Sequence, residues 1–397
     1  MTQNKFAGVL KERAKRITID GESIRHLYVI GNGFDRYHGA DSSYYDFRQY
    51  LLKHKPTIVK TFELFFGPRS LLNSFSNMSE YLWCLQEGLN VPAPKNSWAT
   101  KYLWKDFEVN LSQLNRERVF DFVDSRLPKL YEDDEDFRYA DYYAPIDYIY
   151  DVVQSCSTEM QYQFHRWVNT LHYSKGFKKK MVHLNKSAAF LNFNYTLFLE
   201  SEYQIPQESI LYIHGNRKQP FGSLVLGHNE EDDTIGFEKW VYQHRNRKRY
   251  RPNLKDKKGN YFPNDKLAYL AFFLKDETKG NWRNPIRYYA VNDIEERLED
   301  YYSRNIKHCN DIIDKNIGFF DSLGDLERVT VLGHSLGDVD MTYFRKIKSS
   351  VAYPDKLQWE FSYHTDADIT SINRFCRLLD IPLGENVRPY QMSEFVN

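Results

Sequence analysis

The feature of this sequence that most constrains its fold is a series of short apolar runs that each end in glycine or polar residues. These runs lie at 26–30, 188–193, 210–213, 223–226, 328–332 and 357–363. Such short runs, rich in Val, Ile, Leu and Phe, are typical of strands buried on both faces of a sheet. Helical sequence separates several of them. The alternation predicts an α/β protein with a doubly wound, mostly parallel, Rossmann-like sheet and large helical insertions.

The order of these segments also predicts how the chain is divided. We expect residues 1–45, 186–230 and 326–397 to form the sheet core. Residues 46–185 should form a mainly helical insertion, and residues 231–325 a second one with helices and a charged loop. Ligands of such sheets bind beyond the carboxyl ends of the strands, so the residues that follow each apolar run are the candidates for a site.

The charge balance and the cysteines exclude several classes of protein. Lysine plus arginine number 54, as do aspartate plus glutamate, so no overall field attracts nucleic acid or an anionic membrane. The four cysteines include no CxxC pair, which argues against a zinc module and a secreted disulfide scaffold. No apolar stretch is long enough for a signal peptide or a membrane-spanning helix. We therefore expect a cytoplasmic protein without a metal, a membrane contact or a nucleic-acid partner.

The first candidate motif follows the first apolar run and consists of Gly31, Asn32, Gly33, Phe34 and Asp35, with Gly39 six residues after Gly33. Glycines directly after a strand allow a tight turn and let the backbone approach a phosphate at the start of a helix. The pattern departs from GxGxxG because Arg36 occupies the place of the third glycine. An ordinary turn at the end of a strand explains the glycines equally well.

Polar residues also follow the next two predicted strands. Asn192 and Asn194 flank the end of one, and His214 ends the other beside Gly215. Asparagines at a strand end could orient a water molecule or a sugar hydroxyl, and they also cap turns through bonds to the backbone. A histidine beside a glycine suits a general base, and a buried structural histidine fits the same pattern.

A further motif, Gly333-His334-Ser335-Leu336-Gly337, matches the G-x-S-x-G nucleophile elbow of α/β-hydrolases. Such an enzyme needs an acid and then a histidine after the serine, each beyond a further strand. Only 62 residues follow Ser335, and His364 is the single histidine among them. The triad therefore lacks room, and a serine hydrolase is retained only as the rival enzyme.

Taken in order, these motifs resemble those of the AbiH family of bacterial phage abortive-infection proteins. The matching pieces are VIGNGFDRYHG at 29–39, LNFNYT at 191–196, IHGN at 213–216, VLGHN at 225–229 and LGHSLGDVD at 332–340. Five motifs in the same order are much more specific than any one of them, and they span essentially the whole chain. The resemblance implies an antiphage defence protein, with a homo-oligomer and a phage-derived trigger as further partners.

A more distant resemblance, to sirtuin-type NAD-binding domains, implies a mechanism. Those domains carry a GAGxS turn with a later glycine, a TQN-type strand end, a catalytic HG and a GTS turn in the same order. By this resemblance Asn194 would position the ribose or an attacking water, and His214 would act as base on a ribose hydroxyl. The dinucleotide would contact Gly31, Asn32, Gly33, Phe34, Asp35, Gly39, Asn192, Gly333, His334 and Ser335.

The sirtuin resemblance is incomplete at three points. Asp35 replaces the small serine of the first motif, Thr196 stands where sirtuins have aspartate, and the paired CxxC zinc ribbon is absent. Protein deacylation on the sirtuin plan is therefore not expected. The activities that the resemblance still implies are hydrolysis of NAD or binding of a related nucleotide, in both cases without a metal.

Two other functions remain open on the sequence. A serine hydrolase would use Ser335. A non-catalytic effector would bind a nucleotide or a nucleic acid, the latter through the basic segment 244–258, whose lysines and arginines could neutralise phosphates. We interpret that segment as a solvated loop of an electrically neutral protein.

Overall fold

The structure is a computed structural model that describes residues 23–66, 103–114, 119, 122–123, 126–127, 138–229, 285–384 and 386–395. The described residues form two compact units. The first unit holds those of Met1–Ser43, Val168–Val225 and His308–Asn397, and the second holds those of Tyr44–Trp167 and Leu226–Lys307. The basic segment 244–258 lies outside the described residues.

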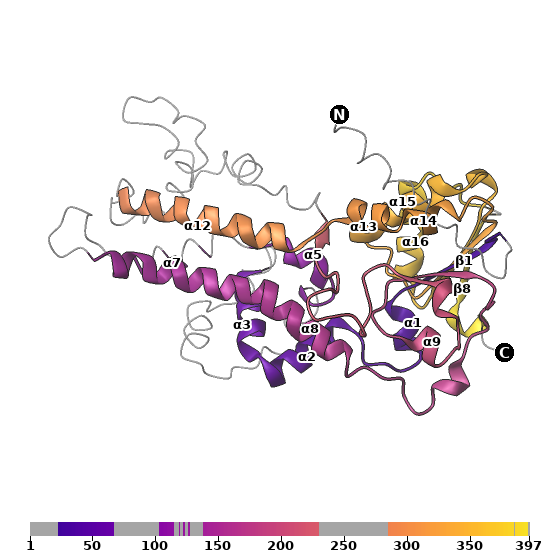
Figure 1. Ribbon diagram of the computed structural model, residues 1–397, viewed down its shortest axis with the longest axis horizontal. Helices are drawn as coiled ribbons and strands as arrows, with labels where there is room; N and C mark the ends of the chain where they lie inside the picture. The colour runs from indigo at the N-terminus through magenta and orange to yellow at the C-terminus, as the bar shows by residue number, and fades with distance from the viewer. Residues whose placement is uncertain are drawn as a thin grey trace, which may run out of the picture. The chain divides into compact units, whose positions relative to one another are not determined.

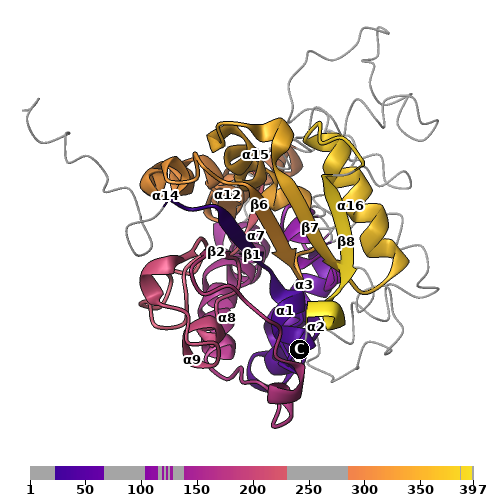
Figure 2. The same cartoon turned by 90° about the vertical axis from the view of Figure 1, so that its right-hand side faces the viewer.

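A six-stranded, all-parallel sheet lies at the centre of the first unit (Figure 2). Its strands are β1 (His26–Ile30), β2 (Ala189–Asn192), β3 (Ile210–Tyr212), β6 (Arg328–Leu332), β7 (Gln358–Tyr363) and β8 (Val387–Gln391). Their spatial order is β3-β2-β1-β6-β7-β8, so the chain builds outward from one side of β1 and then from the other. The predicted α/β class and parallel sheet are confirmed.

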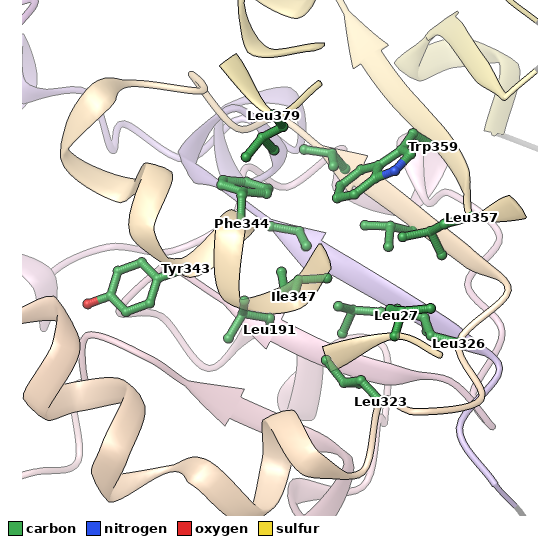
Figure 3. Packing of buried hydrophobic residues seen from close by; sticks show 14 of the residues in the cluster. Leu27, Leu191, Leu323, Leu326, Tyr343, Phe344, Ile347, Leu357, Trp359 and Leu379 are labelled. Carbon is green, nitrogen blue, oxygen red and sulfur yellow. The ribbon is translucent and has the colours of Figure 1, made fainter. Parts of the chain in front are cut away.

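Hydrophobic clusters cover both faces of this sheet. The α15 face carries α13 (Cys309–Lys315), α14 (Ile317–Asp321), α15 (Met341–Ser350) and α16 (Asp366–Leu378). Leu27 and Leu191 of the strands pack there with Phe344 and Trp359 (Figure 3). The opposite α1 face carries α1 (Asn32–Tyr37) and α9 (Phe198–Ser201) over Tyr28 and Phe190. Because neighbouring strand residues point to opposite faces, both sides of each central strand are buried.

Short helical turns complete the first unit: η4 (Phe177–Lys180), η5 (Gln207–Ser209), η8 (Asp338–Asp340), η9 (Pro354–Lys356) and η10 (Met392–Phe395). Turn η8 leads directly into α15 and contributes to the candidate site.

Two segments differ from the sequence-based prediction. Residues 223–226, predicted as a strand, lie outside the sheet. The N–H of Val225 donates to the carbonyl oxygen of His214, and its carbonyl accepts from the Tyr195 hydroxyl, so loop contacts satisfy this backbone. Strand β8 has no clear signal in the sequence because Pro389 interrupts it. Proline is tolerated there because β8 is the edge strand.

The second unit is mainly helical in its described part. Its helices are α2 (Tyr44–His54), α3 (Pro56–Phe65), α5 (Phe107–Leu111), α7 (Tyr139–Gln154), the π-helical turn η3 (Ser155–Glu159), α8 (Met160–Val168) and α12 (Pro285–Arg304). Helices α7 and α12 run side by side (Figure 1), joined by a hydrogen bond from the Tyr142 hydroxyl to Asp293 (2.9 Å). Strands β4 (His228–Asn229) and β5 (Ile306–Lys307) form a small parallel pair. No helix in the described ranges has the length and hydropathy to span a bilayer.

Candidate functional site

The loops after β1 and β6 meet at the carboxyl edge of the sheet. The N–H of Gly33 donates to the carbonyl oxygen of Gly333 at 2.7 Å. A Cβ added to Gly333 would lie 2.1 Å from the backbone nitrogen of Phe34, and Gly333 has a φ of +66°, which favours glycine. A Cβ added to Gly31 would likewise lie 2.5 Å from the Cα of His334. These glycines therefore let the two loops pack directly against each other.

Other residues that the sequence predicts to contact a ligand have structural roles in the first loop. The N–H groups of Gly39 and Ala40 bond back to carbonyl oxygens near the end of α1, at 2.9 and 3.0 Å, and Gly39 has a φ of +83°. This pair of bonds is a Schellman motif, which ends a helix. Asn32 exchanges two hydrogen bonds with Ser42, of 2.7 and 2.5 Å. Phe34 is fully buried, so its side chain belongs to the core of the α1 face.

Asn192 and Asn194 tie the end of β2 to the end of β1. The side-chain oxygen of Asn192 accepts the N–H of Asn194 at 3.0 Å, which is the turn-capping role. The side-chain Nδ2 of Asn194 donates to the carbonyl oxygen of Gly31 at 3.1 Å. Both side chains are buried. The amide of Asn194 is thus held beside the first glycine turn.

Asp35 is the centre of a buried polar group that we call the Asp35 cluster, formed with Thr196, Tyr173, Asn194 and Arg217. Thr196 Oγ1 donates to Asp35 Oδ2 at 2.6 Å, and the Tyr173 hydroxyl lies 3.5 Å from Oδ1. Burial raises the pKa of Asp35 to about 7, although hydrogen bonds from Thr196 and Asn194 and the charge of Arg217 act in the opposite direction. A carboxyl group that titrates near neutrality can take up or release a proton under physiological conditions.

His214 and His334 face the same carboxylate, and with Asp340 and Phe193 they form what we call the Asp340 cluster. Nε2 of His214 lies 3.6 Å from Oδ1 of Asp340, and Nε2 of His334 lies 3.6 Å from Oδ2. Both imidazoles are 3% exposed, and the Asp340 side chain is 13% exposed. The Phe193 ring packs edge-on against both imidazoles. The structure therefore brings together residues that follow β2, β3 and β6.

Ser335 is exposed, and its loop does not have the shape of a nucleophile elbow. In an elbow the serine occupies a strained turn directly between a strand and a helix. Here the left-handed residues of the loop are Gly333 and Leu336, with φ values of +66° and +55°. Helix α15 begins only at Met341. The geometry therefore gives no support to Ser335 as a nucleophile.

Asp340, Tyr173 and Arg217 are site residues for which the sequence predicts no role. Asp340 ends the motif LGHSLGDVD and Arg217 directly follows IHGN, so their positions beside motif residues were the available signal. Tyr173 lies in a segment without a motif. In the described ranges no group of three or more His, Cys, Asp or Glu side chains is arranged to hold a metal ion.

The sequence profile of the family described as "Bacteriophage abortive infection AbiH" matches residues 27–363. The chain belongs to the AbiH family. The match begins in β1 and ends with β7, so it contains every residue of the Asp35 and Asp340 clusters. Membership indicates a role in bacteriophage abortive infection. No curated protein and no solved structure matches the chain.

Proposed function

We propose that this AbiH protein acts in abortive infection by binding a nucleotide, NAD in the first place, and hydrolysing NAD to nicotinamide and ADP-ribose. The observation that carries the proposal is the strand order, which changes direction between β1 and β6. We take the sheet to be the doubly wound, Rossmann-like arrangement, whose dinucleotides bind outside the carboxyl ends of the strands at this point. The loops that carry Gly33, Asn194, His214 and Gly333 all leave the sheet at that edge.

The contact between Asp35 and Thr196 supports the sirtuin-like part of the proposal. Sirtuins have a serine at the first of these positions and an aspartate at the second. In this protein the hydroxyl of Thr196 donates to the carboxyl of Asp35 at 2.6 Å. The acid and the hydroxyl have exchanged positions and lie in contact. Because this carboxyl is buried and hydrogen-bonded, it presents little free charge to a pyrophosphate.

In the proposed reaction the bond between C1′ of the ribose and the nicotinamide nitrogen breaks, and nicotinamide leaves as a neutral molecule. Water adds to the oxocarbenium-like carbon and loses a proton to a base. His214 is this base and acts through a ribose hydroxyl, which gives its own proton to the imidazole and receives the one that water loses. The Asp340 carboxylate beside His214 favours the imidazolium. Asn194 positions the ribose or the water. Since the His214 side chain is only 3% exposed, substrate must displace neighbouring groups to reach it.

The experiment that tests this function compares nicotinamide release from NAD by the wild-type protein and by three variants. Asn194→Ala and His214→Gln should each lose activity by about 100-fold or more, the usual loss when a positioned general base is removed. Ser335→Ala is the matched control on the same edge of the sheet. It should lose about 10-fold or less, because it removes at most one neutral hydrogen bond to the ligand.

Melting temperatures of all four proteins show whether each variant is folded, and p-nitrophenyl ester cleavage is measured in parallel. If Ser335→Ala alone abolishes turnover while Asn194→Ala and His214→Gln stay near wild type, the sirtuin-like mechanism is wrong. If NAD raises the melting temperature and no nicotinamide is released, the protein binds a nucleotide without hydrolysing it.

A further inference from the structure

We propose that Asp35 is a positioning residue that, in its ionised form, holds the side-chain amide of Asn194 in one orientation, with Oδ1 left to accept a hydrogen bond from an O–H group of the ribose or of the attacking water. Asp35 takes no part in the reaction proposed above. The orientation of the amide stands on the contacts of the Asp35 cluster. Its consequence for hydrolysis rests on the proposed function.

Two hydrogen bonds tie the loop after β2 to the segment that follows β1. Nδ2 of Asn194 donates to the carbonyl oxygen of Gly31 at 3.1 Å. Two residues further along the loop, Oγ1 of Thr196 donates to Oδ2 of Asp35 at 2.6 Å. Asp35 and Thr196 are each 2% exposed, and a hydrogen bond that is shielded from water is strong and costly to break. These bonds hold two residues of the loop against the same short stretch of chain.

The contacts of Asn194 fix the orientation of its amide. A carbonyl oxygen can only accept a hydrogen bond, so the atom that faces Gly31 is the nitrogen Nδ2. The ionised carboxyl of Asp35 also can only accept, and the same amide donates a hydrogen bond to it. Both N–H groups of Asn194 are then engaged within the protein. Its oxygen Oδ1 is the polar atom that remains for a ligand, and it can accept a hydroxyl proton.

The second of these contacts depends on the protonation state of Asp35. A protonated carboxyl carries an O–H donor, which can bond to Oδ1 of Asn194 instead of accepting from Nδ2. Burial raises the pKa of Asp35 to about 7. The carboxylate that orients the amide is therefore present above about pH 7 and is lost as the pH falls through that value.

The other titratable side chains that act on Asp35, in the part of the chain that the structure describes, keep their charge near pH 7. Arg217 stays positive, and its charge favours the carboxylate. His38 stacks on the ring of Tyr173, and burial lowers its pKa, so the imidazole is neutral. Burial raises the pKa of three neighbouring phenols, which are therefore neutral: Tyr173, Tyr203 and Tyr212.

NMR of the full chain tests the orientation without any turnover. Carbon-13 and nitrogen-15 labels report the carboxyl of Asp35 and the side-chain amide of Asn194 between about pH 5 and pH 9. Asp35→Asn and Asn194→Ala identify the two signals. We expect both groups to titrate together, with a midpoint near pH 7. An Asp35 that does not titrate in this range, or an Asn194 amide that stays constant while Asp35 titrates, overturns the proposal.

Thr196→Val removes the hydroxyl that donates to Asp35 at nearly constant side-chain volume. The lost hydrogen bond favoured the carboxylate, so the midpoint of both titrations should move up by about 1 pH unit. Thr196→Ser is the matched control, because it keeps the hydroxyl, and it should keep the wild-type midpoint. Melting temperatures show whether both variants are folded. An unchanged midpoint in a folded Thr196→Val protein also overturns the proposal, and if that variant does not fold, the wild-type titration decides.

The consequence for hydrolysis has its own readout in the pH profile of kcat. Nicotinamide release should fall as the pH drops below about 7, and in Thr196→Val this acidic limb should move to higher pH by the same amount as the NMR midpoint. The hydrogen bond of Thr196 goes to Asp35, so a displaced limb identifies Asp35 rather than His214 as the titrating group. A limb at the same pH in both proteins would contradict this consequence. Absence of turnover in the wild-type protein would contradict the proposed function, and the NMR titration would then decide the role of Asp35.

Discussion

At the scale of single residues, the two carboxyl groups at the carboxyl edge of the sheet lie in different surroundings. Asp35 is 2% exposed and accepts a hydrogen bond from Thr196. Asp340 is partly exposed and faces two imidazoles. Burial disfavours a charged carboxylate, whereas neighbouring groups that can become positive favour it. We therefore expect Asp35 to respond to pH through stability and Asp340 to act through the histidines.

Asp35→Asn should change how stability depends on pH. The folded protein holds the Asp35 proton up to about pH 7, whereas an ordinary aspartate releases it near 3.8. The stabilising contribution of the protonated group is fully present below pH 3.8 and is lost as the pH rises to 7. Asparagine does not titrate. The melting temperature of Asp35→Asn relative to wild type should therefore rise by roughly 5 °C between pH 5 and pH 8.

The matched control for this measurement is Asp325→Asn, because Asp325 is exposed. Its melting-temperature difference from wild type should be the same at each pH. A constant difference for Asp35→Asn as well would show that Asp35 keeps an ordinary acidity in the folded protein.

Gly333→Ala should destabilise the protein by about 3 kcal/mol or more. The added Cβ would meet the backbone of Phe34 at 2.1 Å and would also sit on a residue with positive φ. Gly222→Ala separates the two effects, because Gly222 has a φ of +84° and no atom within 4 Å of an added Cβ. The Gly222→Ala control should lose about 1 kcal/mol of unfolding free energy. Equal losses of unfolding free energy in the two variants, measured by chemical denaturation, would show that the loops after β1 and β6 are not in close contact.

At the scale of secondary-structure elements, a partly buried chain of polar side chains crosses three strands on the α1 face. Thr330 of β6 donates its hydroxyl proton to Glu360 of β7 at 2.7 Å, so it must accept the proton of Nε2 of His26 of β1, at 2.8 Å. Burial, followed by the charge of Arg328, lowers the pKa of His26 to about 4, so the ring is neutral at physiological pH. These bonds join the strands on either side of the point where the strand order changes direction.

Thr330→Val should lower the free energy of unfolding by about 1–3 kcal/mol, because it leaves His26 and Glu360 without their shared partner at nearly constant side-chain volume. Thr330→Ser keeps the hydroxyl and should stay within about 1 kcal/mol of wild type. Urea denaturation of the two variants and wild type measures both values. A valine variant as stable as the serine variant would mean that this polar chain contributes nothing to holding the strands together.

At the scale of the whole molecule, the sequence predicts the inner strands of the sheet better than the segments at its edges. Strands β1, β2, β3, β6 and β7 follow from apolar runs, and the structure buries β1, β2 and β6 on both faces. Residues 223–226 were wrongly predicted as a strand. An apolar run does not show whether its backbone hydrogen bonds go to a neighbouring strand or to loop residues, here His214 and Tyr195. Strand β8 is missed because an edge strand buries little and tolerates Pro389.

The location of the candidate site can be predicted from the sequence, whereas the contacts between its side chains cannot. The motifs place Asp35, Asn194, His214 and His334 at strand ends. Nothing in their spacing shows that Asn194 contacts Gly31 or that the two histidines share Asp340, because these contacts depend on loop conformations set by packing. The positive φ of Leu336, which brings its N–H to the His334 ring, is likewise invisible in the sequence.

A crystal structure of the protein grown with ADP-ribose would show whether a nucleotide binds where the strand order changes direction. We expect electron density for the ligand over the loops after β1 and β6, with the terminal ribose beside Asn194 and His214. Density for ADP-ribose only at another place in the molecule, or none at a ligand concentration that raises the melting temperature, would contradict it.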